Sequence, residues 1–320
     1  MSRPTVLEIC AGGGGQSLGL ETAGFSHVLA LDNDNDACNT LKMNRPDWTI
    51  VEDDIRSFTG ADLSGVDLLA GGVPCPPFSI AGKQLGGNDE RDLFPEAIRL
   101  IKALKPKAVL LENVRGLATA KFDGYRDLVL SQLRDLGYIP DWKLINASDF
   151  GVPQLRPRFV LVAFRPEFAE RFRWPAPSTQ QTPTVGSTLQ DLMASRNWPG
   201  VCRWVKVANG IAPTIVGGSK KHGGPDLGPT RARQAWSKLG VDGLGLANFP
   251  PAPDFPTDGT PRLTVRMVAR LQGFPDEWLC SGGKTTAHRQ VGNAFPPPVA
   301  RAVGLAIRLA LCGKSENAVD

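Results

Sequence analysis

The chain lacks the marks of a secreted, zinc-bound or membrane-anchored protein. Its six cysteines lie far apart and form no C-x-x-C pair, so we expect reduced thiols rather than a zinc ribbon or a disulfide framework. The opening residues, MSRPTVLEIC, contain neither the cationic segment nor the apolar core of a signal peptide. No stretch approaches the ~18 uninterrupted apolar residues that a membrane helix requires. These absences predict a soluble, intracellular protein with no membrane partner.

A strong charge of either sign is also missing. The chain has 36 Lys and Arg against 32 Asp and Glu, a net charge of +4, which admits both nucleic acid and small metabolites as ligands. Apolar residues make up 42% and charged residues 21% of the 320 residues, a balance that argues against wholesale disorder. The length suits one large domain or two unequal ones.

Short apolar runs alternate with helical patterns through the first half of the chain. This alternation predicts an α/β fold with a mainly parallel sheet covered by helices on both faces. Strands are expected at 5–10, 27–32, 51–55, 66–72, 108–113 and 158–164. A helix is expected through Leu18, Leu20 and Glu21. Further helices are expected at 36–43, near 93–104, at 125–136 and, as a strongly apolar closing helix, at 298–311.

The composition changes near Trp174. Residues 175–260 contain 12 Gly and 11 Pro, show weak periodicity and carry an excess of three positive charges. A linker would have a similar composition, but Trp198, Trp204 and Trp236 favour a small folded, loop-rich domain. We therefore predict a larger domain from 1–174 and 262–320, whose closing segment packs back on the first, and a second domain at 175–261.

A glycine-rich turn follows the first predicted strand in LEICAGGGGQS. Glycines let a backbone approach a ligand closely, and the next helix offers free N–H groups, although such a turn also serves for simple chain reversal. Asp32 closes the second strand, where an acid binds ribose hydroxyls, and Asp54 follows the third. The spacing fits neither G-x-G-x-x-G nor a phosphate loop. A nucleoside-bearing cofactor without bound phosphates fits best.

Three further segments carry reactive side chains. Cys75 lies between two prolines after a strand end and is either a nucleophile or an inert buried thiol. Glu112 directly follows an apolar strand, where partial desolvation suits a carboxyl to proton donation, although an exposed acid is equally common there. Arg156 and Arg158, at i and i+2 on one predicted strand, face the same side and would clamp a phosphate or carbonyl, unless they form a solvated edge.

Taken in order, six segments resemble the cytosine-C5 DNA methyltransferases, which use S-adenosylmethionine. The segments are EICAGGGG, GGVPCPPFS, ENV, QLRPR, RLTVRMVARLQGFP and QVGNAFPPPV, which span Glu8 to Val299. The resemblance implies a Rossmann-like S-adenosylmethionine methyltransferase domain with a mainly parallel sheet. It also implies that the unmatched segment 175–261 is a target-recognition domain.

The resemblance implies roles for the reactive residues. Cys75 becomes the nucleophile that adds to C6 of cytosine, because loss of ring aromaticity makes C5 reactive toward the methyl group. Glu112 holds or protonates N3, and Arg158 contacts the cytosine oxygen and holds Glu112, with Arg156 placed beside them. The target base must leave the duplex to reach Cys75. The base that removes the C5 proton is not identified.

The same resemblance places the cofactor, S-adenosylmethionine, which leaves as S-adenosylhomocysteine; no metal is expected. Three family positions differ here: Cys10 replaces a common Phe, Pro76 a common Gln and Ala81 a common Ser, which predicts altered affinity or lid kinetics rather than loss of activity. The predicted cofactor residues are Cys10, Ala11, Gly12, Gly13, Gly14, Gly15, Asp32, Asn33, Asp54, Ile55, Pro74, Leu93 and Asn293. The predicted DNA contacts are Ser79, Gln84, Lys220, Lys221, His222, Arg231, Arg233 and Gln234, of residue types that read base edges or bind phosphates.

We expect a monomeric enzyme of bacterial or phage origin that acts on double-stranded DNA in the cytoplasm. A restriction endonuclease of the same system is a candidate partner. A tRNA cytosine-C5 methyltransferase of the same family and a non-catalytic DNA-recognition protein are the alternatives. The sequence does not identify the recognised site or exclude a sulfonium donor that carries a larger group.

Overall fold

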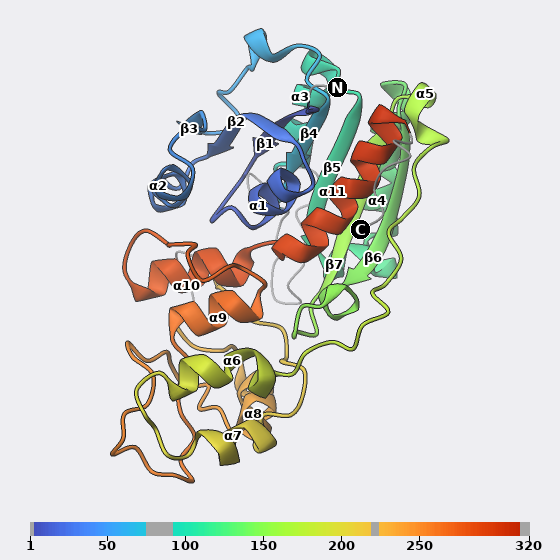
Figure 1. Cartoon of the computed structure of the whole chain (residues 1–320). Helices are drawn as coiled ribbons and strands as arrows, with labels where there is room; N and C mark the ends of the chain where they lie inside the picture. Colours follow the sequence, from blue (N-terminus) through green and yellow to red (C-terminus); the bar gives the residue numbers. More distant parts are fainter. Residues whose placement is uncertain (1–2, 75–91, 219–223, 314–320) are drawn as a thin grey trace. The chain divides into compact units, whose positions relative to one another are not determined.

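The computed structural model describes residues 3–74, 92–218 and 224–313 (Figure 1). They form two compact units, of which the first contains Met1–Ile145, Pro157–Ala176 and Val299–Asp320. The second contains Asn146–Arg156 and Pro177–Pro298. Residues 262–298 therefore group with the second unit in this division, while the assignment of a catalytic and a target-recognition domain stays a prediction.

A seven-stranded sheet forms the centre of the first unit, in the order β3-β2-β1-β4-β5-β7-β6. The pairs β1–β2, β1–β4, β2–β3 and β4–β5 are parallel, and β7 is antiparallel to β5. The strands are β1 Thr5–Ile9, β2 Ser26–Asp32, β3 Ile50–Glu52, β4 Leu68–Gly71, β5 Ala108–Val114, β6 Ile139–Asn146 and β7 Pro157–Phe164.

Helices cover both faces of this sheet. Alternate residues of the strands, such as Leu7 and Ile9, form one buried apolar cluster with α3 (Phe94–Leu104) and α4 (Asp123–Asp135). The other helices of this unit are α1 Gly15–Thr22, α2 Asn35–Asn44 and α5 Pro166–Ala169, and short 3-10 turns lie at η1 Ala61–Leu63, η2 Arg115–Ala118 and η3 Ala120–Phe122. The predicted α/β class with a mainly parallel sheet is confirmed.

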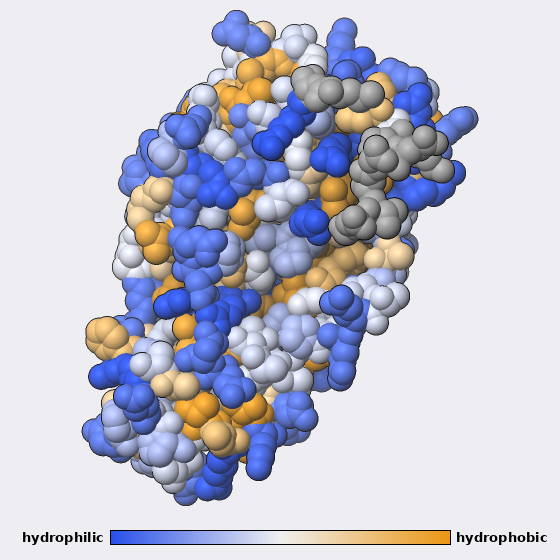
Figure 2. All heavy atoms as spheres, viewed as in Figure 1, coloured by the Kyte–Doolittle hydropathy of each residue, from blue (hydrophilic) through white to orange (hydrophobic). Residues whose placement is uncertain are grey.

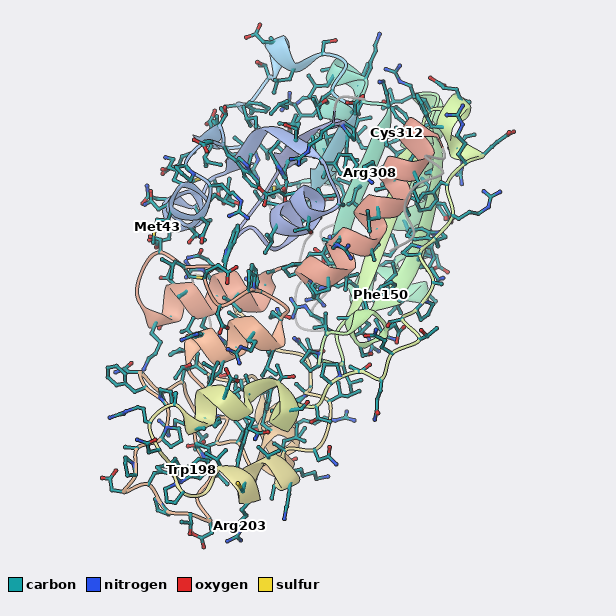
Figure 3. The ribbon with its side chains drawn as sticks, viewed as in Figure 1. Met43, Phe150, Trp198, Arg203, Arg308 and Cys312 are labelled. Atoms are coloured by element: carbon teal, nitrogen blue, oxygen red, sulfur yellow. The ribbon has the colours of Figure 1, made fainter. Side chains whose placement is uncertain are left out.

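The closing helix α11, Pro297–Cys312, returns to the first unit and crosses in front of β5 and β7 (Figure 1). It packs on α1, since a Cβ added at Gly304 would lie 2.9 Å from the Cβ of Ala23. The Arg308 guanidinium, labelled on α11 in Figure 3, lies against Gly24. The helical stretch Lys284–Cys312 is long and apolar enough to cross a membrane, but 56% of its most apolar window is buried within the protein, as in a core helix.

The second unit is built from short helices around three buried tryptophans. Trp198, labelled in Figure 3, packs edge-on against Phe255 at 5.6 Å, and its indole N–H donates to the Phe255 carbonyl at 3.1 Å. Trp204 donates to the Gly240 carbonyl at 2.9 Å, and Trp236 is fully buried. Its elements are η4 Ala147–Phe150, α6 Val185–Ala194, α7 Val201–Val207, α8 Thr230–Lys238, α9 Val265–Leu271 and α10 Lys284–Asn293.

Two strand details differ from the prediction. The strand β6 has no clear apolar alternation, since Asp141 and Lys143 interrupt it, and so it was not expected. The strand β7 was expected to continue the parallel pattern, but it follows β6 directly and runs antiparallel to β5. Arg156 precedes β7, so the expectation that Arg156 and Arg158 share a strand is wrong.

Candidate active site

Four predicted strand ends meet at the carboxyl edge of the parallel sheet. In the register, Ile9 pairs with both Leu31 and Gly71, and Gly71 pairs with Leu111. The next residues along these strands are Cys10, Asp32, Gly72 and Glu112, so they form one row at the sheet edge. In open α/β sheets ligands bind at this edge.

The turn after β1 adopts a backbone conformation that requires glycine at two positions. Gly12 and Gly14 have φ values of 55° and 85°, in the left-handed region that glycine tolerates best, and Cys10 is also left-handed at 51°. Asp32 stabilises the turn because its Oδ2 accepts from the Gly12 N–H at 2.7 Å. Its Oδ1 accepts from the Asp34 N–H at 2.8 Å and so fixes the start of α2.

The thiol of Cys10 is held in its neutral form in this arrangement. Burial, with the nearby carboxylates of Asp32 and Asp54 adding to it, raises the pKa of Cys10 far above the ordinary thiol value. The side chain therefore stays neutral near pH 7. It packs partly buried against the apolar cluster that includes Ile9 and Ile55.

The turn leaves polar groups and space for a ligand. A Cβ added at Gly12 would meet no atom of the described residues within 4 Å. Next to it, Gln16 and Ser17 at the start of α1 are buried, and their side-chain polar atoms find no hydrogen-bond partner among the described residues. Buried polar groups in native proteins are normally paired, so these atoms fit a cofactor that carries polar groups. Sequence reasoning missed Gln16 and Ser17, because the burial of these side chains depends on the folded surroundings of α1.

The predicted adenine-contacting pair lies after β3. Ile55 is buried, and its carbonyl accepts a hydrogen bond from Arg99 of α3 at 2.7 Å. Asp54 pairs with Arg56 at 2.9 Å and remains partly exposed. Asn33 is exposed directly after Asp32.

Pro74 and Leu93 lie on either side of residues 75–91 in the sequence and are in contact in the structure. The Leu93 N–H donates to the Pro74 carbonyl at 3.1 Å. Asn113, the residue after Glu112, donates from its amide to the Val73 carbonyl at 2.8 Å. The backbone that leads to Cys75 is thus tied to β5. Cys75, Ser79, Gln84, Pro76 and Ala81 lie outside the described residues.

Glu112 and Arg158 form a buried ion pair. Oε1 of Glu112 lies 2.8 Å from Nε of Arg158, and the register places Val114 opposite Arg158 across β5 and β7. Burial lowers the pKa of the Arg158 guanidinium, while the Glu112 carboxylate opposes this shift. A Cβ at Gly72 would lie 3.5 Å from Oε2 of Glu112, so this carboxylate also faces the end of β4. One carboxyl and one guanidinium here can hold a neutral ring that presents a ring nitrogen and a carbonyl.

Arg156 does not accompany Arg158 as predicted. It belongs to the second unit, is fully buried and donates to the carbonyls of Ile215, Gly292 and Ala294. These bonds occupy its guanidinium with backbone, which argues for a structural role.

The remaining predicted positions lie in the second unit or outside the described residues. Arg231, Arg233 and Gln234 lie on α8, and Asn293 is the last residue of α10. The Asn293 amide donates to the Gly218 carbonyl at 3.1 Å. Lys220, Lys221 and His222 are not among the described residues. In Figure 2 hydrophilic side chains cover much of the face shown, with apolar patches between them. Among the described residues no group of three or more His, Cys, Asp and Glu could hold a metal ion.

Comparisons with known proteins agree on one family. A family model for C-5 cytosine-specific DNA methylases matches residues 4–308. The Type II methyltransferase M.NaeI of Lentzea aerocolonigenes is 58% identical over 316 residues, which cover 98% of this chain and 76% of that protein. The Type II methyltransferase M.NgoMIV of Neisseria gonorrhoeae is 53% identical over 319 residues, which cover 98% and 99%.

Solved structures share the fold. The Dnmt2 methyltransferase of S. pombe superposes with a TM-score of 0.63 at 18% sequence identity, covering 97% of this chain and 98% of that one. The methyltransferase EhMeth of Entamoeba histolytica gives a TM-score of 0.67 at 14% identity, covering 96% and 98%.

Proposed function

We propose, from the premise that the chain belongs to the C-5 cytosine-specific DNA methylase family, that its methyl transfer proceeds through a covalent bond between Cys75 and C6 of a flipped-out cytosine. The matching family model and the two Type II methyltransferases confirm the family resemblance seen in the sequence, and the protein is a DNA cytosine-C5 methyltransferase. The observation that carries the proposal for the site is the buried Glu112–Arg158 pair at the carboxyl edge of the sheet. It lies in the same unit as the glycine turn and the backbone that leads to Cys75.

The cofactor in this proposal is S-adenosylmethionine. Its methyl group is an electrophile, and S-adenosylhomocysteine remains after transfer. The glycine turn from Cys10 to Gly15 would hold the methionine and adenosine parts, and Asp32 would bind the ribose hydroxyls. Ile55 and Asp54 would line the adenine. The open space at Gly12 and the unpartnered polar atoms of Gln16 support this placement.

The chain's own residues activate the cytosine. The Cys75 thiolate adds to C6, forming a sulfur–carbon bond and moving electron density toward C5 and N3. Glu112, once protonated, donates this proton to N3 as the charge develops, and Arg158 holds both the carboxyl group and the cytosine oxygen. After C5 acquires the methyl group, the N3 proton returns to Glu112, a base removes the C5 proton, and the electron pair expels Cys75 as thiolate.

We place the reaction in double-stranded DNA within a restriction-modification system. The two bacterial relatives described above are Type II methyltransferases, which supports a restriction endonuclease as partner and the bacterial cytoplasm as location. We assign catalysis to residues 1–174 and 262–320 and target recognition to residues 175–261. A monomer is proposed, and size-exclusion chromatography should give a mass near 34.3 kDa.

Trapping on 5-fluorocytosine tests the mechanism, because fluorine cannot leave as a proton. Wild-type enzyme with cofactor and duplex DNA that contains 5-fluorocytosine should give a complex that survives denaturing electrophoresis. Cys75→Ala should give neither this complex nor transfer of labelled methyl. Cys202→Ala, which removes an exposed free cysteine, is the matched control and should behave as wild type.

Full methyl transfer by Cys75→Ala would overturn the covalent mechanism. Label that appears in tRNA but not in duplex DNA would favour the tRNA alternative. Tight DNA binding without any transfer would indicate a protein that recognises DNA without catalysis.

A further inference from the structure

A buried polar cluster of Gln154, Arg156 and Gln272 lies in the second unit, and none of its three side chains is exposed. Nη1 of Arg156 donates to the Ile215 carbonyl at 2.7 Å. Nη2 donates to the carbonyls of Gly292 at 2.7 Å and Ala294 at 2.9 Å. One guanidinium therefore joins a loop between α7 and α8 to the C-terminal end of α10.

Gln154 holds the same loop from its other side. Its Oε1 accepts from the Ile215 N–H at 2.8 Å, and its Nε2 donates to Oε1 of Gln272 at 2.6 Å. Gln272 in turn donates to the Val291 carbonyl at 2.8 Å. Both the N–H and the carbonyl of Ile215 are thus fixed by side chains: Arg156 binds α10 directly, and Gln154 is linked to it through Gln272. Such hydrogen bonds are strong in a buried site, and they specify one geometry.

The contact between the loop and α10 continues past Ile215. A Cβ added at Gly292 would lie 2.5 Å from the Cα of Gly217, so the two backbones touch. The Asn293 amide donates to the Gly218 carbonyl at 3.1 Å. Farther along, the His288 ring nitrogen Nε2 lies 2.9 Å from the Asp226 carbonyl. α10 therefore holds the loop both at residues 215–218 and at residue 226.

The held segment leads directly into α8. This helix begins at Thr230 and carries Arg231, Arg233 and Gln234, of which Arg231 and Gln234 are exposed. The Leu227 N–H also donates to the Gly243 carbonyl at 3.1 Å, which fixes the chain just before the helix. The direction in which α8 presents these side chains therefore depends on the cluster.

We propose that Arg156 is a positioning residue for DNA recognition and not a residue that contacts the cytosine. It fixes residues 215–218 on α10, which also holds residue 226, and these contacts set the orientation of α8 toward duplex DNA. Arg158, two residues later, belongs to the other unit and pairs with Glu112. The inference rests on the proposed function in one respect, that duplex DNA is the substrate.

Arg156→Lys tests this role because lysine keeps the charge but cannot reproduce the planar fork that reaches three carbonyls. We expect the KM for cognate duplex DNA to rise about tenfold or more, as expected when one or more charge-assisted hydrogen bonds are lost. The kcat at saturating DNA should stay within about threefold of wild type, and the KM for S-adenosylmethionine should not change. Sequencing of methylated cytosines in a host that expresses the variant should show methylation at sites that differ from the cognate one.

Hydrogen exchange supplies a readout that does not depend on activity. In Arg156→Lys the amides of residues 215–218 and 226–238 should exchange faster, and those of β5 and β7 should not. Arg270→Lys is the matched control, since Arg270 lies in the same unit and donates to Asp276 at 2.8 Å and to the Thr188 carbonyl at 3.2 Å. It should lower stability without changing site choice.

Two results would overturn the inference. One is unchanged exchange at 215–218 and 226–238 in Arg156→Lys. The other is a kcat at saturating DNA as low as that of Arg158→Lys with an unchanged KM for DNA. If Arg156→Lys does not fold, Gln272→Met decides instead, because it removes the cluster's bond to the Val291 carbonyl of α10 at a residue outside the cofactor and DNA positions. A raised KM for DNA supports positioning, whereas a raised KM for the cofactor alone contradicts it. A wild-type enzyme without activity on DNA would contradict the proposed function but leave the exchange result intact.

Discussion

Nε of Arg158 lies 2.8 Å from Oε1 of Glu112, and each side chain is only 9% exposed. A pair this deeply buried is held in place by the antiparallel register of β5 and β7, which sets Val114 opposite Arg158. Removal of one partner from such a pair leaves an uncompensated buried charge, so the two residues depend on each other for stability as well as for chemistry.

Glu112→Gln separates these two contributions. Glutamine retains a hydrogen-bond acceptor for Arg158 but cannot donate a proton from a carboxyl group, so we expect kcat to fall about 10²- to 10⁴-fold. Transfer of labelled methyl at saturating DNA and cofactor measures this loss. Thermal melts of this variant and of Asp276→Asn, which breaks partly buried ion pairs away from the site, show how much of the effect is structural. Activity within a few-fold of wild type would exclude proton donation by Glu112.

Asp32→Asn should weaken cofactor binding without affecting DNA binding. The Asp32 carboxylate accepts from the Gly12 and Asp34 N–H groups, and an amide cannot accept with both of its ends. Loss of one such charge-assisted bond corresponds to about a 10- to 100-fold loss of affinity. Calorimetry with S-adenosylhomocysteine measures the change, and Asp47→Asn, at an exposed turn position, serves as control. Equal affinities of Asp32→Asn and Asp47→Asn for S-adenosylhomocysteine would show that Asp32 does not contribute to cofactor binding.

The strand ends were predictable because they follow from local pattern. Buried apolar runs that end in Asp32 and Glu112 place these residues at one edge of any parallel sheet, and the structure does so. Glycines that precede a helix likewise predict the turn, whose positive φ values at Gly12 and Gly14 require that residue type.

The misplaced residues depend on contacts between distant segments. Arg156 and Arg158 appear equivalent in sequence, yet the first binds carbonyls about 60 and 136 residues away, and the second pairs with Glu112. The hydrophobic periodicity around residues 156–158 cannot predict which distant partner each arginine has. The buried Gln16 was missed for a similar reason, since burial of its amide depends on the folded surroundings of α1.

The Arg270–Asp276 pair should make the stability of the second unit depend on pH at the acid end. A hydrogen bond from Arg270, assisted by Arg266, lowers the pKa of Asp276 to about 2, below its unfolded value of about 3.9. A lowered folded pKa stabilises the protein above the unfolded value, and this stabilisation is lost as the pH falls from about 4 to about 2. After screening by solvent its size is of the order of 1 kcal/mol. Denaturant melts of wild type and Asp276→Asn should therefore differ at pH 6 and converge near pH 2, and a constant difference would contradict this assignment.

Gly292→Ala tests the backbone contact that joins α10 to the loop at Gly217. A Cβ at residue 292 would lie 2.5 Å from the Cα and 2.6 Å from the N of Gly217. These distances are shorter than non-bonded contacts of Cβ atoms in folded proteins. Gly217 cannot move freely, because Arg156 fixes Ile215 before it and Asn293 fixes Gly218 after it. We expect a loss of about 1–3 kcal/mol in the free energy of unfolding, as for other overpacked sites. Gly124→Ala in α4 is the control, since a Cβ there meets no described atom within 4 Å and alanine favours a helix. Chemical denaturation of both variants measures the difference, and a Gly292→Ala protein as stable as wild type would show that α10 and the loop can separate without cost.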